Sequence, residues 1–111
     1  MSSTRPKQVV IVGKTYRIRV VTERADGFED GDYGMCDNDA HVISIIAGRS
    51  LGNDQDTLLH EVIHAVEFQM GVDGEINKRP SHEHCVQALA TGLLAFIKDN
   101  PAAVSYLRRK K

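Results

Sequence analysis

The sequence predicts an α+β domain in which a small antiparallel sheet of about three strands packs on two long helices. β-Branched and alternating runs fill the first half of the chain, and apolar residues at helical spacing fill the second half. The 111 residues suffice for one compact domain and are too few for two. We expect that domain over residues 8–107, between a flexible start at residues 1–7 and a basic tail at residues 108–111.

Three strands are expected in the first half. Residues 9–12 form a β-branched run, residues 13–14 offer a turn, and residues 16–21 alternate apolar and polar side chains, which together predict a β-hairpin. Residues 25–34 are rich in glycine and aspartate, which indicates a loop. Residues 41–47 are mostly apolar, so a third, well-buried strand is expected there.

The first long helix is expected to end at about Met70. Asn53 or Asp54 can cap its start, and Gly71 offers a stop. The helix dipole favours the acidic residues of the first turn, Asp54 and Asp56. Apolar residues at helical spacing form the core stripe of this helix, namely Leu58, Leu59, Val62 and Val66.

A second long helix is expected over residues 82–98. Ser81 can cap its start, and Asp99-Asn100-Pro101 ends it. A short last helix from about Ala102 to Leu107 can follow. The core stripe of the second helix is again apolar and consists of Val86, Leu89, Leu93, Phe96 and Ile97.

The first helix carries the motif His60-Glu61-Val62-Ile63-His64. Residues four apart lie on the same face of a helix, so His60 and His64 can hold one metal ion between them. Glu61 points to the side of that pair, which suits a general base acting on water better than a third ligand. On a helix, this motif is typical of zinc hydrolases.

The start of the second helix offers three candidates for a further ligand: His82, Glu83 and His84. A catalytic zinc site has three protein ligands and one open position. Glu83 and Gln87 share a face beside the apolar stripe of their helix, as the motif histidines do on theirs. Packing of the two stripes would bring Glu83 to the histidines. Position therefore favours Glu83, with His84 and then His82 as alternatives.

The spacing of the motif and Glu83 resembles the gluzincin metallopeptidases. Residues 83–90 resemble the second zinc helix of the minimal, ImmA/IrrE-like group, in which a ligand glutamate precedes a polar residue, a large apolar residue and an alanine. Further similarity to small phage-encoded proteins of this type lies in residues 58–65, 92–93 and 99–101. The resemblance covers roughly residues 33–101.

The resemblance implies a zinc-dependent metallopeptidase that hydrolyses a peptide bond with zinc-activated water. It implies Zn²⁺ bound by His60, His64 and Glu83, with Glu61 as the general base, and a peptide or protein as substrate. It also implies that the strand at residues 42–47 is an edge strand that flanks the substrate, where an extended peptide could pair with it.

Two other functions stay open. A domain of this size has little room for a deep substrate cleft, so it can instead be a zinc-binding regulatory or structural domain without peptidase activity. A fourth protein ligand, His84 or His82, would close such a site. A nucleic-acid-associated factor using the basic tail would show salt-sensitive DNA binding.

A peptidase also needs a group that stabilises the oxyanion. The candidates for this role are Tyr33, Arg79, His82 and Tyr106.

The composition argues against several classes of protein. A formal net charge of −1 gives no sign of nucleic-acid binding through bulk charge. No apolar stretch is long enough to span a membrane, and residues 1–7 carry no signal-peptide pattern. Cys36 and Cys85 form no Cys-x-x-Cys motif and are expected as free thiols in a reducing compartment. We therefore expect a cytoplasmic protein; its oligomeric state does not follow from the sequence.

Other polar residues and thiols have structural interpretations. Glu67, one turn after His64, either orients that histidine or is a solvated helix residue. His41, at a strand start, is expected to be structural or exposed. Cys85 is expected to be a buried core thiol, and Cys36 to be inert.

Overall fold

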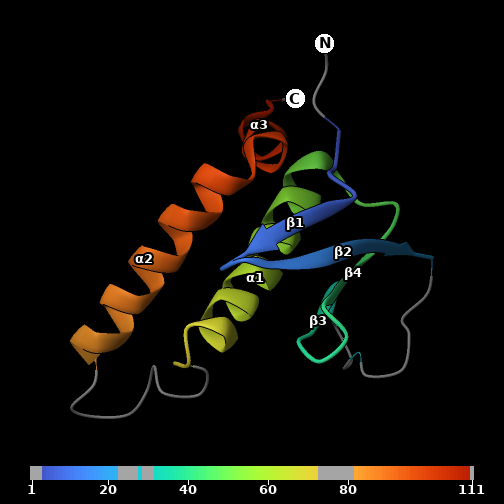
Figure 1. Cartoon of the computed structure of the whole chain (residues 1–111). Coiled ribbons are helices and arrows are strands. Elements are labelled where there is room, and N and C mark those ends of the chain that lie inside the picture. Colours follow the sequence, from blue (N-terminus) through green and yellow to red (C-terminus); the bar gives the residue numbers. More distant parts are fainter. Residues whose placement is uncertain (1–3, 23–27, 29–31, 73–81, 111) are drawn as a thin grey trace.

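The computed structural model describes residues 4–22, 28, 32–72 and 82–110, with the backbone alone at residues 82–84. Within these ranges the chain forms a mixed sheet and three helices, so the predicted α+β class is confirmed (Figure 1). The elements in chain order are β1 (Gln8–Ile11), β2 (Lys14–Val21), β3 (Gly34–Asp37), β4 (Val42–Ile46), α1 (Leu51–Gln69), α2 (His82–Asp99) and α3 (Pro101–Arg108).

The sheet has four strands in the order β1-β2-β4-β3. β1 pairs antiparallel with β2, and β3 pairs antiparallel with β4, but β2 and β4 run parallel, with Ile18 opposite Ile43. The expectation of about three purely antiparallel strands was therefore wrong. β3 was missed because its sequence, Gly-Met-Cys-Asp, directly follows a stretch rich in glycine and aspartate and has few residues with high β propensity.

The edge strand of the sheet differs from the one expected. β4 lies between β2 and β3, so residues 42–47 cannot flank a substrate as an edge strand. The apolar run of β4 suits a strand with a neighbour on each side, and Ile43 and Ile45 are fully buried. In the part of the chain that the structure describes, β3 is the last strand at this side of the sheet.

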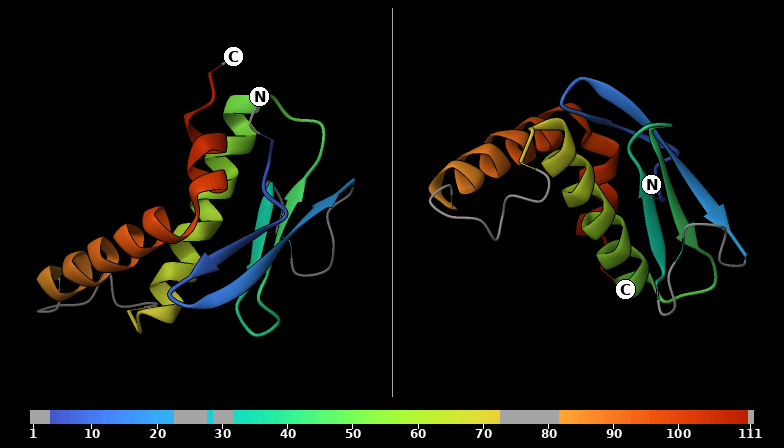
Figure 2. Two further views of the ribbon diagram at one scale, coloured as in Figure 1. Left: turned by 45° about the horizontal axis from the view of Figure 1, so that its top comes forward. Right: turned by 90° about the horizontal axis from the view of Figure 1, so that it is seen from below.

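The three helices lie on one side of the sheet (Figure 2). α1 packs directly on the strands, α2 packs against α1 and β1, and α3 packs against α1 and α2. The buried cluster between the layers joins residues of strands and helices: Val9, Ile11, Tyr16, Ile43, Ile45, Leu58, Val62, Ala65, Val66, Phe96, Ala103 and Tyr106. No described helix has the length and apolar character that a membrane crossing needs.

The predicted helix stripes were partly wrong. Leu59 is 38% exposed, because α1 turns Leu58, Val62, Ala65 and Val66 toward the core instead. On α2, Val86 and Ile97 are exposed, whereas Phe96 and the small residues Cys85 and Ala88 are buried. The buried face of α2 is thus rotated from the stripe of large apolar residues, since small residues allow closer approach of the helix.

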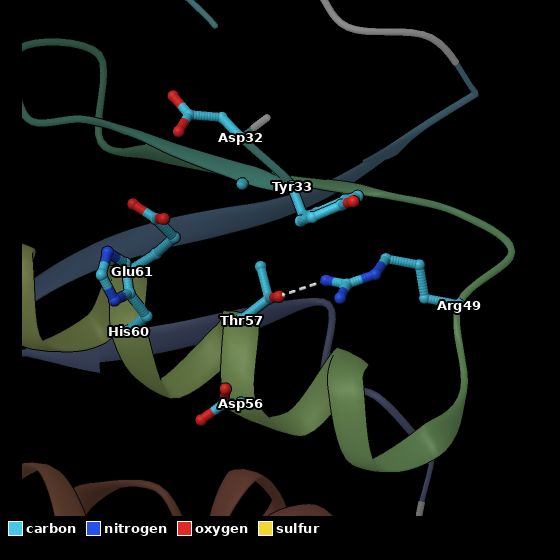
Figure 3. Close-up of a pocket in the computed structure, with 8 residues that line it drawn as sticks. Asp32, Tyr33, Arg49, Asp56, Thr57, His60 and Glu61 are labelled. Atoms are coloured by element: carbon cyan, nitrogen blue, oxygen red, sulfur yellow. Dashed lines mark hydrogen bonds between the residues drawn. The ribbon is translucent and has the colours of Figure 1, made fainter. Parts of the chain in front are cut away.

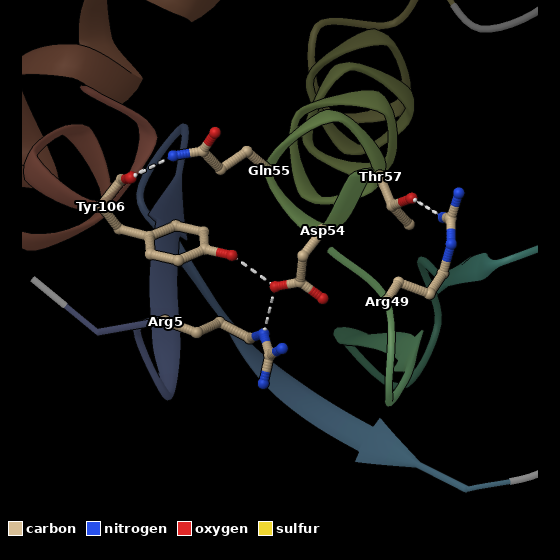
Figure 4. A network of polar contacts seen from close by, with 6 residues as sticks. All are labelled: Arg5, Arg49, Asp54, Gln55, Thr57 and Tyr106. Atoms are coloured by element: carbon tan, nitrogen blue, oxygen red, sulfur yellow. Dashed lines mark hydrogen bonds and ion pairs between the residues drawn. The ribbon is translucent and has the colours of Figure 1, made fainter. Parts of the chain in front are cut away.

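α1 begins earlier than the sequence indicated. Ser50 is its N-cap, and the Ser50 hydroxyl accepts a hydrogen bond from the Asn53 backbone N–H at 3.2 Å. Neither Asn53 nor Asp54 caps the helix. Asp54 is buried instead, where its carboxylate accepts hydrogen bonds from Arg5 at 2.8 Å and from the Tyr106 hydroxyl (Figure 4). This network joins the N-terminal segment, α1 and α3.

Asn100, between α2 and α3, pairs with the backbone of β1. Its side-chain oxygen accepts from the Val10 N–H at 2.7 Å, and its Nδ2 donates to the Val10 carbonyl at 2.7 Å and to the Phe96 carbonyl at 2.9 Å. The amide therefore supplies the donor and acceptor that a further strand would offer. The predicted end of the second helix and the short C-terminal helix are both confirmed.

Candidate metal centre

The two motif histidines face each other on α1. The Nε2 atoms of His60 and His64 lie 3.1 Å apart, and their rings meet edge to face with centroids 4.7 Å apart. Both residues are exposed, so a group held between them would be open to solvent. The helix places them together because residues four apart lie one above the other on its surface.

This pair fits one zinc ion. Two nitrogens bound to zinc at about 2.0–2.1 Å with a tetrahedral angle lie about 3.3 Å from each other, close to the 3.1 Å that separates the two Nε2 atoms. The same separation also suits a hydrogen bond in which one ring carries a proton on Nε2. The geometry is therefore compatible with a metal and with a metal-free pair.

Glu67 lies behind His64. Its Oε1 atom is 3.4 Å from Nδ1 of His64, and its side chain is largely buried. A carboxylate at this nitrogen favours the tautomer with the proton on Nδ1, which leaves the Nε2 lone pair for a metal. Of the two interpretations of Glu67, the structure supports the residue that orients His64 over the solvated helix residue.

Glu61 points toward β3 and is 6% exposed. Gly34 at the start of β3 lies directly against the Glu61 side chain. A Cβ atom on Gly34 would lie 3.1 Å from Oε2 of Glu61. Burial raises the pKa of Glu61, His60 and His64 lower it, and the charge of Asp32 raises it further. The net direction of the pKa shift is upward, which makes this carboxyl group a better proton acceptor than an exposed glutamate.

A cleft runs between β3 and α1, which we call the β3–α1 cleft. It consists of two adjoining hollows of about 220 and 280 Å³ that share Asp32, Gly34, His60 and Glu61. The first also includes Tyr33, Arg49, Asp56 and Thr57 (Figure 3). The second also includes Met35, Cys36, Asn38 and His64. A shallow, open cleft along a strand suits an extended chain better than an enclosed small molecule.

Arg49 closes one end of the cleft. Its Nη1 donates to the Thr57 hydroxyl at 2.8 Å, and its guanidinium carbon lies 3.7 Å from the centre of the Tyr33 ring. Figure 3 shows the Tyr33 ring directed toward Arg49 and away from Glu61. Tyr33 is therefore not placed to stabilise an oxyanion beside the histidines in this conformation.

Of the other oxyanion candidates, Tyr106 is the one whose side chain the structure describes, and it lies away from the cleft. The Tyr106 hydroxyl donates to Asp54 near the start of α1, and its side chain is 3% exposed (Figure 4). Arg79 and the His82 side chain lie outside the described residues. A residue that the sequence did not single out, Asn38, does line the cleft.

The third ligand stays a prediction. Among the side chains that the structure describes, no group of three or more His, Cys, Asp or Glu could hold a metal ion. Glu83 and its alternatives His82 and His84 lie in the first turn of α2, where the described structure is the backbone alone. The set His60, His64 and Glu83 is therefore neither assembled nor excluded.

The remaining candidates have mainly structural roles. Cys85 is buried beside Val72 and Ala88, as expected of a core thiol. His41 adopts a positive φ of 57° and stacks on Tyr16 with ring centroids 4.8 Å apart, so its structural interpretation is supported. Cys36, expected to be inert, lines the cleft. No pattern in the sequence indicates this position, because residues 35–40 are assigned to no predicted element.

Comparisons with protein-family models, with curated proteins and with solved structures found no match to the chain. The resemblance to gluzincins therefore rests on the residues of the motif and of α2 alone. The functional argument depends on the geometry of His60, His64 and Glu61 and on their place beside β3.

Proposed function

We propose that the protein is a zinc-dependent metallopeptidase, with His60, His64 and Glu83 as zinc ligands and Glu61 as the general base. The observation that carries this proposal is the convergence of three groups. The Nε2 atoms of the two histidines are 3.1 Å apart, and the buried carboxyl group of Glu61 lies between that pair and β3. A metal, a base and a peptide would meet at this place.

The donor set suits zinc, because imidazole nitrogens and a carboxylate are common ligands of catalytic zinc. When bound, zinc lowers the pKa of a water ligand toward neutrality and polarises a carbonyl group. Glu61 accepts the proton of the attacking water at its carboxylate and passes it to the leaving amine. Glu67 keeps His64 in the tautomer that binds a metal, with its Oε1 atom at 3.4 Å from Nδ1.

The substrate proposed is a peptide in extended conformation along β3. β3 pairs with β4 through Gly34–Asp37 and ends the described sheet on this side, so its outer backbone groups can pair with an added strand. Such pairing would lay the peptide across Glu61, because Gly34 lies against that residue. The strand addition expected at residues 42–47 is thus reassigned to β3.

A test compares the wild type with Glu61→Gln and His64→Ala, using zinc content and hydrolysis of quenched fluorescent casein as readouts. The proposal expects one zinc per wild-type chain, the same in Glu61→Gln with hydrolysis lost, and zinc lost in His64→Ala. Hydrolysis that survives unchanged in Glu61→Gln would show that the base is wrong. Zinc binding without hydrolysis of any peptide by the wild type would favour the alternative, a zinc-binding regulatory or structural domain.

A further inference from the structure

Asn38 lies at the end of β3, where it lines the same hollow of the β3–α1 cleft as Glu61 and His64. No feature of the sequence distinguished this asparagine from any other turn residue. In the fold, a side-chain amide is brought to the proposed peptide site. What it can do there depends on which way its oxygen and its nitrogen point.

A chain of hydrogen bonds sets the direction of the amide. Nε2 of Gln69 donates to the Tyr16 hydroxyl oxygen at 2.9 Å, so the single Tyr16 proton is left to donate to Oδ1 of Asn38 at 2.8 Å. The Cys36 thiol approaches the same Oδ1 at 3.4 Å. Two donors thus face the Asn38 oxygen, and the Nδ2 group is directed away from both.

The surroundings hold this arrangement in place. Tyr16 is fully buried, and burial raises the pKa of its phenol, so the phenol keeps the proton that it donates. The turn that carries Asn38 is closed by the Asp37 carboxylate, which accepts from the backbone N–H groups of Asp39 and Ala40 at 3.0 and 2.9 Å. The ring of His41 stacks on Tyr16 from the end of that turn.

We propose that Asn38 presents its Nδ2–H to a backbone carbonyl of the peptide in the β3–α1 cleft and so positions the substrate. This inference rests on the proposed peptidase function. A carbonyl oxygen is the group that fits, because Tyr16 and Cys36 already approach the amide oxygen of Asn38, and no residue that the structure describes accepts a hydrogen bond from its Nδ2 group. Since the amide is oriented before the peptide arrives, little conformational entropy is lost when the bond forms.

The test measures binding of two probes to the zinc-loaded protein by calorimetry. Acetohydroxamate reaches a metal but carries no peptide backbone, whereas prolyl-leucyl-glycine hydroxamate carries the same metal-binding group with peptide carbonyls. The deciding variant is Asn38→Asp, which keeps the acceptor for Tyr16 and replaces the donor by a carboxylate oxygen. Asn53→Asp makes the same change of charge at an exposed position of α1 and serves as the matched control.

The proposal expects the tripeptide probe to bind wild type more tightly than acetohydroxamate. Asn38→Asp should weaken the tripeptide about tenfold, as for a lost hydrogen bond with added repulsion, and leave acetohydroxamate and the Asn53→Asp control unchanged. Tyr16→Phe, which removes the proton that orients the amide, should weaken the tripeptide by a smaller factor of about three.

Other results would contradict either the role of Asn38 alone or the peptidase proposal as well. Equal tripeptide affinity in wild type and in both Asn38→Asp and Tyr16→Phe would show that Asn38 does not position the peptide, with the peptidase proposal intact. The same conclusion would follow if the tripeptide bound no more tightly than acetohydroxamate. A wild-type protein that binds neither probe would overturn the peptidase proposal and the role of Asn38 with it.

Discussion

Gly34 lies against Glu61 so closely that a Cβ atom on Gly34 would stand 3.1 Å from both Cγ and Oε2 of Glu61 and 2.7 Å from Cγ2 of Thr57. The hydrogen side chain at this position lets the start of β3 approach α1. The contact between Gly34 and Glu61, the proposed general base, therefore determines how closely β3 and α1 approach each other.

Gly34→Ala should destabilise the fold and displace Glu61. The added methyl group has no room unless Thr57 or Glu61 moves, and overpacking of this kind costs about 1–3 kcal/mol. Urea denaturation measures the loss. Gly52→Ala is the matched control, because a Cβ atom there meets nothing within 4 Å. Equal stability of the two variants would contradict the close approach of β3.

Glu61→Gln should stabilise the metal-free protein at neutral pH. Burial raises the pKa of Glu61 above its ordinary value of 4.5, so the folded state resists losing this proton. Below the ordinary pKa the group is protonated in both states and costs nothing. The cost grows as pH rises from there to the raised pKa and then stays constant. Thermal melts in chelator at pH 4 and pH 7.5 should show a gain for the variant at the higher pH alone.

Asp54→Ala should destabilise the fold without removing the histidine pair. Asp54 is 4% exposed and accepts hydrogen bonds from Arg5 and Tyr106, so its loss leaves two donors without their partner, at a cost of about 1–3 kcal/mol. The pKa of Tyr106 is raised to about 12, so the phenol stays a donor over the accessible pH range. Asp56→Ala, at an exposed position, should be nearly neutral in the same denaturation experiment.

Asn100→Ala should open the free side of β1. The substitution removes both partners of the Val10 backbone and one partner of Phe96, with an expected loss of about 1–3 kcal/mol. Amide hydrogen exchange should show the Val10 N–H losing its protection before the rest of the sheet. Asn53→Ala, on the exposed face of α1, provides the control. Unchanged exchange at Val10 would show that the side-chain pairing does not protect the strand.

The sequence was sufficient where periodicity carries the information. The β1–β2 hairpin, β4 and the helix with the two histidines were found from the spacing of their apolar residues. β3 was not found, since Gly34 is needed for its contact with Glu61 and not for strand formation. The parallel pairing of β2 with β4 was missed for a related reason: β4 runs parallel to β2 because β3, which lies between them in the chain, runs in the opposite direction.

The candidate site could be predicted in part. His60 and His64 converge because the helix repeat demands it, whereas Asn38 comes to the cleft only through the turn after β3. The orientation of its amide depends on a chain of hydrogen bonds from Gln69 through Tyr16 to Asn38, which joins three segments that are far apart in the sequence. No local pattern reports such contacts. The role of Glu83 is still the prediction that position on α2 and the gluzincin resemblance support.

X-ray absorption at the zinc edge of the zinc-loaded protein tests the central claim most directly. If His60 and His64 hold the metal with Glu83 and water, the spectrum will fit two imidazole nitrogens and two oxygens at about 2.0–2.1 Å, with no sulfur. The His64→Ala variant should hold no zinc. A sulfur ligand at about 2.3 Å, from Cys36 or Cys85, or fewer than two imidazoles in the wild type, would contradict the account.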